Sequence, residues 1–180
     1  MHELWLDEFL LMSAPAETVI WLPPNLSAIA LPGEVWKKLP TGDDDEFWWA
    51  SPIYYVSTLG RVYWYTDRAP PHRREGLKSL RIKRRPGKRP RHVTNLHVAN
   101  GGYQSERMVY VSRLVLATHA GPEGAWKPLG RHGPGGSLDD RLCNLARGTY
   151  SENLRDQYAY GERGRGDNKC EYEPSPGFGF

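Results

Sequence analysis

The stretch GRHGPGGSLDDRLCNLARGTYSENLRD, which runs from Gly130 to Asp156, decides the fold of this chain. It contains His132, Asn144 and Asn153 at intervals of twelve and nine residues. Consecutive Gly and Pro residues directly after His132 predict a sharp loop, because Gly and Pro supply the backbone angles that tight turns need. The stretch therefore predicts an imidazole placed at the entrance to a tight loop.

The second half of this stretch predicts a strand followed by a helix. Leu142, Leu145 and Ala146 are spaced as in a short, part-buried strand that returns from the loop. Thr149 and Glu152 have the spacing of a capping box, so we expect a helix to begin at the residue after the threonine. Asn153 then lies in the first turns of this helix, where backbone N–H groups favour an anion.

The residue types in this unit suit the hydrolysis of a phosphodiester. A neutral imidazole such as His132 can take a proton from water, because the ordinary pKa of histidine is about 6.5. A divalent cation would neutralise the phosphate and stabilise the departing oxygen. Mg²⁺ accepts amide oxygens as ligands, so Asn153 is a candidate ligand.

The composition predicts a fold rich in turns and short strands. Apolar residues make up 39% of the 180 residues, and seven Trp and ten Tyr supply much of this share. Fifteen Pro and nineteen Gly indicate many turns. A chain of this length can bury a real core in one medium domain or in two small ones.

Charge is distributed unevenly along the chain. Residues 1–49 carry nine acidic side chains against two lysines, whereas residues 68–92 carry eleven Lys or Arg against Glu75 alone. A basic block of this density favours a polyanion as partner, nucleic acid above all. The alternative is a solvated linker, and we expect residues 67–92 to form an exposed arm that is poorly ordered without a partner.

Other features of the sequence exclude some classes of protein. The chain has two Cys and no CxxC pair, so we expect neither a structural zinc site nor a disulfide framework, and a reducing, cytoplasmic setting fits. No apolar run approaches the roughly twenty residues of a membrane-spanning helix. We expect a soluble protein, with residues 1–30 as a weakly structured extension and residues 161–180 as a flexible tail.

Two further segments predict β-structure. FWWASPIYYVSTLGRVYWY, residues 47–65, predicts two short strands around Leu59-Gly60. Residues 93–119 predict two strands joined across Asn100-Gly101-Gly102, the second of which continues into a helix at 112–119.

The first of these segments carries a family resemblance. Glu34-Val35-Trp36-Lys37, followed by Tyr55 to Val62, resembles the E-x-W-K…Y-x-V-S-N-x-G-R-V pattern of a modular domain attached to phage and homing endonucleases. Thr58 stands where this pattern has Asn. The resemblance implies a β-rich DNA-binding module over residues 31–66, in which Arg61 would contact DNA.

The region around the opening stretch resembles the HNH endonucleases, specifically the phage and intron-homing branch whose third signature residue is Asn. The branch pattern H-x-D-G-x-x-x-N-N-R-x-x-N-L-x-W-G-T-x-x-E-N aligns without a gap on His132, Asp139-Asp140-Arg141, Asn144-Leu145, Gly148-Thr149 and Glu152-Asn153. Upstream, Val111-Ser112-Arg113-Leu114-Val115 and Gly121-Pro122 match V-H-R-L-V…G-P. The resemblance implies an α+β fold with a ββα-metal (HNH, His-Me finger) nuclease domain at residues 93–160.

The resemblance also implies a role for each matched residue. His132 would be the general base, Asn144 would hold the loop, and Asn153 would bind Mg²⁺ or Mn²⁺, with Asp140 as a second candidate ligand. Candidate DNA contacts are Arg61, Arg84, Arg85, Lys88, Arg89, Arg131, Arg141 and Arg155.

Arg131 departs from the family pattern, which often has Asp or Asn there as a metal ligand. A guanidinium cannot bind a cation. Arg131 either removes metal-dependent activity or grips the phosphate that is cut, and both interpretations stay open. Further departures are Pro134 in place of the Asp of H-x-D-G, Ser112 in place of His, and Arg147 in place of Trp.

The sequence thus predicts a monomeric, metal-dependent endonuclease that acts on double-stranded DNA. The alternative is a catalytically degenerate relative that binds DNA without cutting it, and a small RNA-associated protein is a weaker third.

Overall fold

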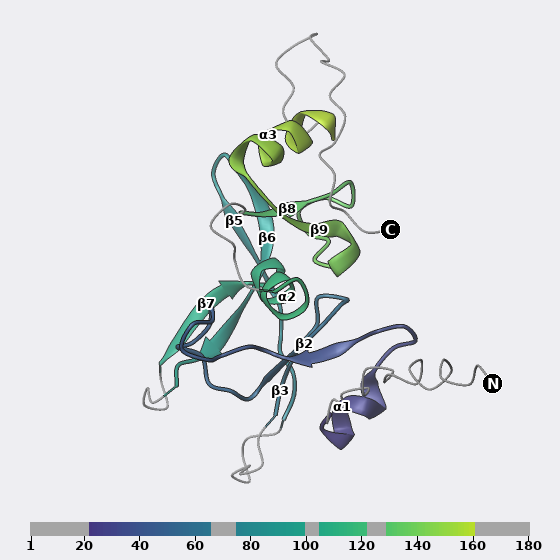
Figure 1. The fold of residues 1–180 in the computed structure, drawn as a ribbon, viewed down its shortest axis with the longest axis vertical. Coiled ribbons are helices and arrows are strands. Elements are labelled where there is room, and N and C mark those ends of the chain that lie inside the picture. The colour runs from purple at the N-terminus through teal and green to yellow at the C-terminus, as the bar shows by residue number, and fades with distance from the viewer. Residues whose placement is uncertain (1–21, 66–74, 100–104, 122–128, 161–180) are drawn as a thin grey trace, which may run out of the picture.

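The computed structural model describes residues 22–65, 75–99, 105–121 and 129–160. Three antiparallel sheets and a few helices make up this part of the chain, so the predicted α+β class is confirmed. In Figure 1 helix α2 (Val111–His119) lies in the middle, with one sheet below it and the unit that carries α3 above it. Among the described residues, no helix has the length and apolarity needed to cross a membrane.

The N-terminal sheet has four strands in the order β1-β2-β3-β4, and each pairs antiparallel with its neighbour. The turn between β2 and β3 falls at Leu59-Gly60, as the sequence predicts, and Gly60 has a φ of 78°. Such a positive φ favours glycine. The elements of this part are α1 (Pro24–Ile29), β1 (Trp36–Lys38), β2 (Tyr54–Ser57), β3 (Val62–Trp64) and β4 (Gly76–Leu77).

The second sheet corrects the expectation of a poorly ordered arm. Seven of the eleven basic residues of the block lie in β5 (Arg81–Arg85) and β6 (Lys88–His97), which pair through a two-residue turn at Pro86-Gly87. Strand β6 also pairs with β7 (Glu106–Tyr110). It runs without interruption through residue 92, where the sequence predicted the boundary between the basic arm and the nuclease domain. The first half of β6 pairs with β5 and the second half with β7, and this pairing satisfies backbone groups along the strand, so it forms despite its charged side chains.

One hydrophobic cluster joins the two regions that the sequence assigned to separate domains. Leu114, Val115 and Leu116 of α2 are buried, and they share this cluster with Tyr54 of β2 and Leu145 near the C-terminal end. The core therefore does not divide at residue 66. The strand pairs at the N-terminal side are fixed relative to the C-terminal unit by this shared packing.

The C-terminal unit is a hairpin followed by a helix, as predicted. Strand β8 (Leu129–His132) pairs antiparallel with β9 (Leu145–Gly148), and the 3₁₀-helix η1 (Leu142–Asn144) leads into β9. Helix α3 (Tyr150–Ala159) begins with the expected capping box, in which the Thr149 hydroxyl accepts from Glu152 N–H. The Glu152 carboxylate in turn accepts from Thr149 N–H at 2.6 Å.

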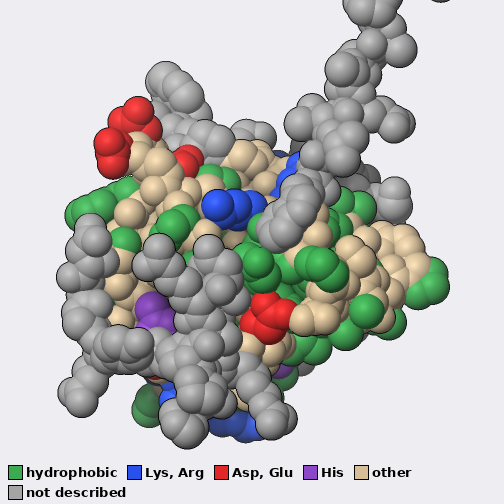
Figure 2. Space-filling view, turned by 90° about the horizontal axis from the view of Figure 1, so that it is seen from below, with side chains coloured by type: hydrophobic (Ala, Val, Ile, Leu, Met, Phe, Trp, Pro, Cys, Tyr) green, Lys and Arg blue, Asp and Glu red, His purple; other side chains and the backbone are tan. Residues whose placement is uncertain are grey.

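The end of the molecule that carries β3 and α1 does not gather basic side chains. Figure 2 shows Lys and Arg there as separate spots among hydrophobic and uncharged surface. The helix suggested by Leu4 to Met12 and the C-terminal tail both lie outside the described residues.

Candidate functional site

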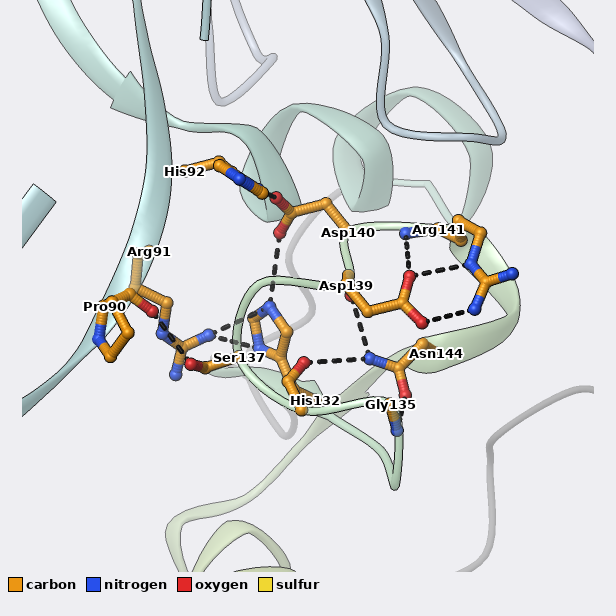
Figure 3. A network of polar contacts seen from close by, with 11 residues as sticks. Pro90, Arg91, His92, His132, Gly135, Ser137, Asp139, Asp140, Arg141 and Asn144 are labelled. Carbon is orange, nitrogen blue, oxygen red and sulfur yellow. Dashed lines mark hydrogen bonds and ion pairs between the residues drawn. The ribbon is translucent and has the colours of Figure 1, made fainter. Parts of the chain in front are cut away.

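His132 is the last residue of β8 and lies at the centre of a polar network (Figure 3). Only 7% of its surface is exposed. Its Nε2 lies 3.3 Å from Asp140 Oδ1, and the Arg91 guanidinium contacts the imidazole at Nδ1. Burial lowers the pKa of His132 below its usual value; the hydrogen bond to Asp140 opposes this shift, and the charge of Arg91 adds to it. These contacts favour a neutral imidazole.

The two partners of His132 suit one tautomer best. A carboxylate can only accept a hydrogen bond and a guanidinium can only donate one. With the proton on Nε2, the imidazole donates to Asp140 and its Nδ1 lone pair accepts from Arg91, whose Nη1 also lies 3.1 Å from Nε2. The basic atom of the imidazole is thus Nδ1, on the side of β6.

Asp140 links two histidines. Its Oδ2 lies 2.9 Å from His92 Nδ1 on β6, while Oδ1 meets His132. The loop that carries Asp140 is held against the N-terminal sheet, because Leu142 N–H donates to the Thr58 carbonyl at 2.7 Å. Gly60 of this part of the chain packs closely against Asp140, because a Cβ added at Gly60 would lie 3.0 Å from the Asp140 Cβ. The N-terminal sheet therefore positions a residue of the C-terminal site.

Asn144 holds the loop that follows His132. Its Oδ1 accepts from Gly135 N–H at 2.8 Å, and its Nδ2 donates to the carbonyls of Gly136 and Asp139 at 3.1 and 2.8 Å. The side chain is nearly buried, with 5% of the residue exposed. These three hydrogen bonds tie the two ends of the loop to the start of β9.

We expect Asn144→Asp to destabilise the protein by about 3 kcal/mol, because two partly buried carbonyls lose their donor and face a carboxylate instead. The substitution keeps the size of the side chain, so the loss reports hydrogen bonding and charge rather than packing. Urea denaturation of both proteins measures the difference. Cys143→Ser is the matched control, since Cys143 is exposed. Equal stability of Asn144→Asp and the control would contradict the role of Asn144 in holding the loop.

Arg131 lies in the interior, where no part of its surface is exposed. Its Nη1 contacts Asp156 Oδ2 of α3 at 2.5 Å, and its Nη2 donates to the Arg147 carbonyl at 3.4 Å. The guanidinium passes over Gly148, where a Cβ would come within 2.1 Å of Arg131 Nε. Arg131 thus links β8 to α3. We leave it out of the proposed DNA-binding surface, because DNA cannot reach a fully buried guanidinium without unfolding this contact.

The predicted metal ligands do not form a donor set. Both oxygens of Asp140 face histidines, and the buried positive charge of Arg131 stands at the residue next to His132. Asn153 is half-buried on α3, and no hydrogen bond joins its side chain to a described residue. No group of three His, Cys, Asp or Glu among the described residues is placed to hold a metal. One neutral amide is a weak ligand set for a divalent cation.

A basic groove runs beside the network. Its volume is about 800 Å³ and its lining has no acidic side chain. Strands β5 and β6 form one wall, and Gly130 of β8 and Gln157 of α3 lie on the other side. Its basic lining residues are Lys83, Arg85, Lys88, Arg89 and Arg91. A groove lined by one sign of charge attracts a polyanion.

The other predicted DNA contacts fall in different environments. Arg61 is bound within the N-terminal part, where it contacts Glu34 at 2.7 Å and stacks on Trp36 at 5.3 Å. Arg141 is exposed but forms two hydrogen bonds with Asp139 at 2.8 and 2.7 Å. Arg84 and Arg155 are exposed, and neither lines the groove. Of the predicted residues, the structure places only Arg85, Lys88 and Arg89 in the groove lining.

Arg91 and His92 are the two site residues that sequence reasoning missed. Both contact residues of the loop and hairpin from 41 and 48 positions away, so nothing local in the sequence marks them. One signal was available: Pro86-Gly87 between two runs of basic and apolar residues is typical of a hairpin turn. A hairpin there would have brought β6 into the fold.

No protein-family model and no curated protein matches the chain. A solved structure described as "DNA binding and cleavage by the HNH homing endonuclease I-HmuI" is similar, with 20% sequence identity and a TM-score of 0.49. The similarity covers 72% of this chain and 61% of that one, so this chain matches less than two thirds of its length. The roles proposed below rest on the contacts of this chain's own residues.

Proposed function

We propose that this chain is a DNA endonuclease of the HNH type, in which His132 is the general base. The observation that carries the proposal is the placement of a neutral, buried imidazole on a ββα unit beside a groove lined by five basic side chains. A base and a phosphate-binding surface are two of the components that hydrolysis of a nucleic acid uses.

In this proposal Nδ1 of His132 takes the proton of the attacking water, whose oxygen bonds to phosphorus. The bond from phosphorus to the leaving oxygen breaks, and solvent water supplies the proton that this oxygen takes up. Asp140 accepts a hydrogen bond from Nε2, keeps the imidazole in this tautomer and stabilises the imidazolium that forms. His92 donates to the other oxygen of Asp140 and so orients the carboxylate. Asn144 keeps the loop after His132 in place. The described residues supply no divalent-cation site, and no step is assigned to a cation.

The partner in this proposal is double-stranded DNA bound by a monomer. Phosphates in the groove would contact Lys83, Arg85, Lys88 and Arg89, which give affinity without reading sequence. The resemblance of residues 34–62 to a nuclease-associated module supports a second DNA contact in the N-terminal sheet.

Relaxation of supercoiled plasmid tests the proposal. The purified protein is incubated with plasmid in parallel reactions with Mg²⁺, Mn²⁺ or EDTA, and open-circular and linear products are separated on a gel. Conversion to open-circular or linear DNA in any of these reactions supports hydrolysis. Intact plasmid in all of them contradicts it.

A second candidate function is DNA binding without cleavage. The buried Arg131–Asp156 pair favours it, because a positive charge is fixed where the family pattern often has a metal ligand. This function predicts an affinity that falls steeply with salt, as counterions are released from each contacted phosphate. Salt-sensitive binding together with uncut plasmid would establish this second function and exclude the first.

Cleavage should persist on the acidic side of the ordinary histidine range. Burial lowers the pKa of His132, and the charged groups facing it are Arg91 from β6 and Asp139 and Asp140 from the loop. Because the base must be neutral, the rate is expected to decline only below about pH 6.5, the ordinary value. Initial rates between about pH 5 and pH 8, the range in which histidine titrates, measure this limit. A decline that begins above the ordinary value would contradict the assignment of a desolvated base.

A further inference from the structure

Arg91 differs from the other arginines near the site in the group that it contacts. Arg131 pairs with Asp156, Arg141 pairs with Asp139, and Arg147 lies 3.4 Å from Glu46. Arg91 contacts the imidazole of His132 instead, and no described carboxylate lies within ion-pair distance of its guanidinium. The charge of Asp140 acts on Arg91, but it forms no ion pair with the guanidinium, so the positive charge is only partly offset by the described part of the protein.

The position of Arg91 makes this charge costly to the protein alone. The residue is half-buried, and burial lowers the pKa of its guanidinium. A charged group that loses water without gaining a counter-charge is unfavourable, and an anion would remove this penalty. A phosphate suits the guanidinium well, because its oxygens can accept two parallel hydrogen bonds.

Arg91 also connects the groove to the imidazole. It lines the groove and it touches His132. Of the residues that line the groove, only Arg91 and its neighbour Pro90 belong to the network of Figure 3. Arg89 lies two positions earlier on β6, hence on the same face of the strand, and it lines the groove as well. A nucleic-acid backbone that follows the basic side chains of the groove toward β8 would therefore bring one phosphate to Arg91.

We infer that Arg91 binds the phosphate of the nucleic acid that lies next to His132, and that this binding releases the imidazole for catalysis. Without an anion, the guanidinium donates to Nδ1 and covers the lone pair of the base. When a phosphate oxygen takes over this hydrogen bond, Nδ1 is free to accept a proton from water. The inference rests on the proposed function and adds a phosphate-binding catalytic residue to it.

Steady-state cleavage by Arg91→Ala and Arg91→Lys tests the role in catalysis. We expect Arg91→Ala to lower kcat by about 10²-fold or more, the usual effect of removing one donor to developing negative charge. Arg91→Lys should restore only part of the rate, because an ammonium cannot bind phosphate in the bidentate way. Arg85→Ala removes the same charge elsewhere on the groove wall and should act mainly by raising KM. An effect of Arg91→Ala confined to KM would overturn the inference.

An NMR titration tests the same site without relying on cleavage. The His132 ring signals, assigned by comparison with His132→Gln, are followed in wild type and in Arg91→Ala as a short DNA duplex or inorganic phosphate is added. We expect the duplex to shift these signals in wild type and to leave them largely unchanged in Arg91→Ala. Such shifts in a protein that does not cut DNA would support the phosphate site while excluding hydrolysis. Unmoved signals with saturating duplex, or shifts with inorganic phosphate alone, would overturn the assignment to a nucleic-acid phosphate.

Discussion

His132→Ala is expected to lower the rate of plasmid cleavage by about 10²–10⁴-fold, the range over which a positioned general base contributes to catalysis. The substitution removes the imidazole that would take the proton of the attacking water, and alanine offers no replacement. DNA affinity should change little, because the imidazole is 7% exposed and the basic side chains of the groove remain. Gel analysis of the plasmid and fluorescence anisotropy of a labelled duplex measure the two quantities.

His97→Gln is the matched control for this prediction. His97 lies at the other end of β6, where its Nδ1 is 3.5 Å from Glu106 and its ring lies against Trp64. We expect this variant to cut at the wild-type rate. If His132→Ala cuts as fast as wild type, His132 is not the base and the endonuclease mechanism proposed here is wrong.

Asp156→Ala is expected to destabilise the protein by about 3–5 kcal/mol, the range found when one partner of a buried ion pair is removed. Arg131 has no exposed surface and Asp156 is 2% exposed, so water cannot replace the lost carboxylate. The guanidinium would stay buried between β8 and α3 with one hydrogen bond to the Arg147 carbonyl among its known contacts. The midpoint and slope of urea denaturation measure this loss.

Two further variants separate charge from packing. Arg131→Met combined with Asp156→Leu removes both charges and keeps apolar volume, so it should recover most of the stability that Asp156→Ala loses. Arg113→Ala should have a far smaller effect than Asp156→Ala, because the Arg113 side chain is 51% exposed where it pairs with Glu46. A loss in Asp156→Ala no larger than that in Arg113→Ala would show that the buried pair does not hold α3 on the hairpin.

The elements that the sequence predicted correctly are those governed by local signals. The capping box of α3, the turn at Leu59-Gly60 and the hairpin with its tight loop depend on residues within a few positions of one another. Hydrogen bonds over such short separations form in almost any tertiary context. The same holds for Asn144, whose three partners lie within nine residues.

The basic block was the main error of sequence interpretation. Its charge predicted an arm, but β6 is held by strands on both sides and by burial of Val93 and Leu96 against the core. Pairing partners and burial depend on distant segments, so charge density alone could not predict them. The large sequence separation between β6 and the loop also explains why Arg91 and His92 were not predicted as site residues. The division into domains at residue 66 did not predict the hydrophobic core that both regions share.

The sequence by itself determined the ββα unit and the register of His132 and Asn144, because short-range backbone hydrogen bonds and turn chemistry specify them. Only the tertiary structure decided what surrounds the imidazole. Packing of β6 and the N-terminal sheet against this unit brought Arg91 to His132 and Asp140 to both histidines. The same packing placed Arg131 in the interior against Asp156, 25 residues away. Electrostatic environment depends on which groups are brought together and on how much water is excluded, and both follow from long-range contacts.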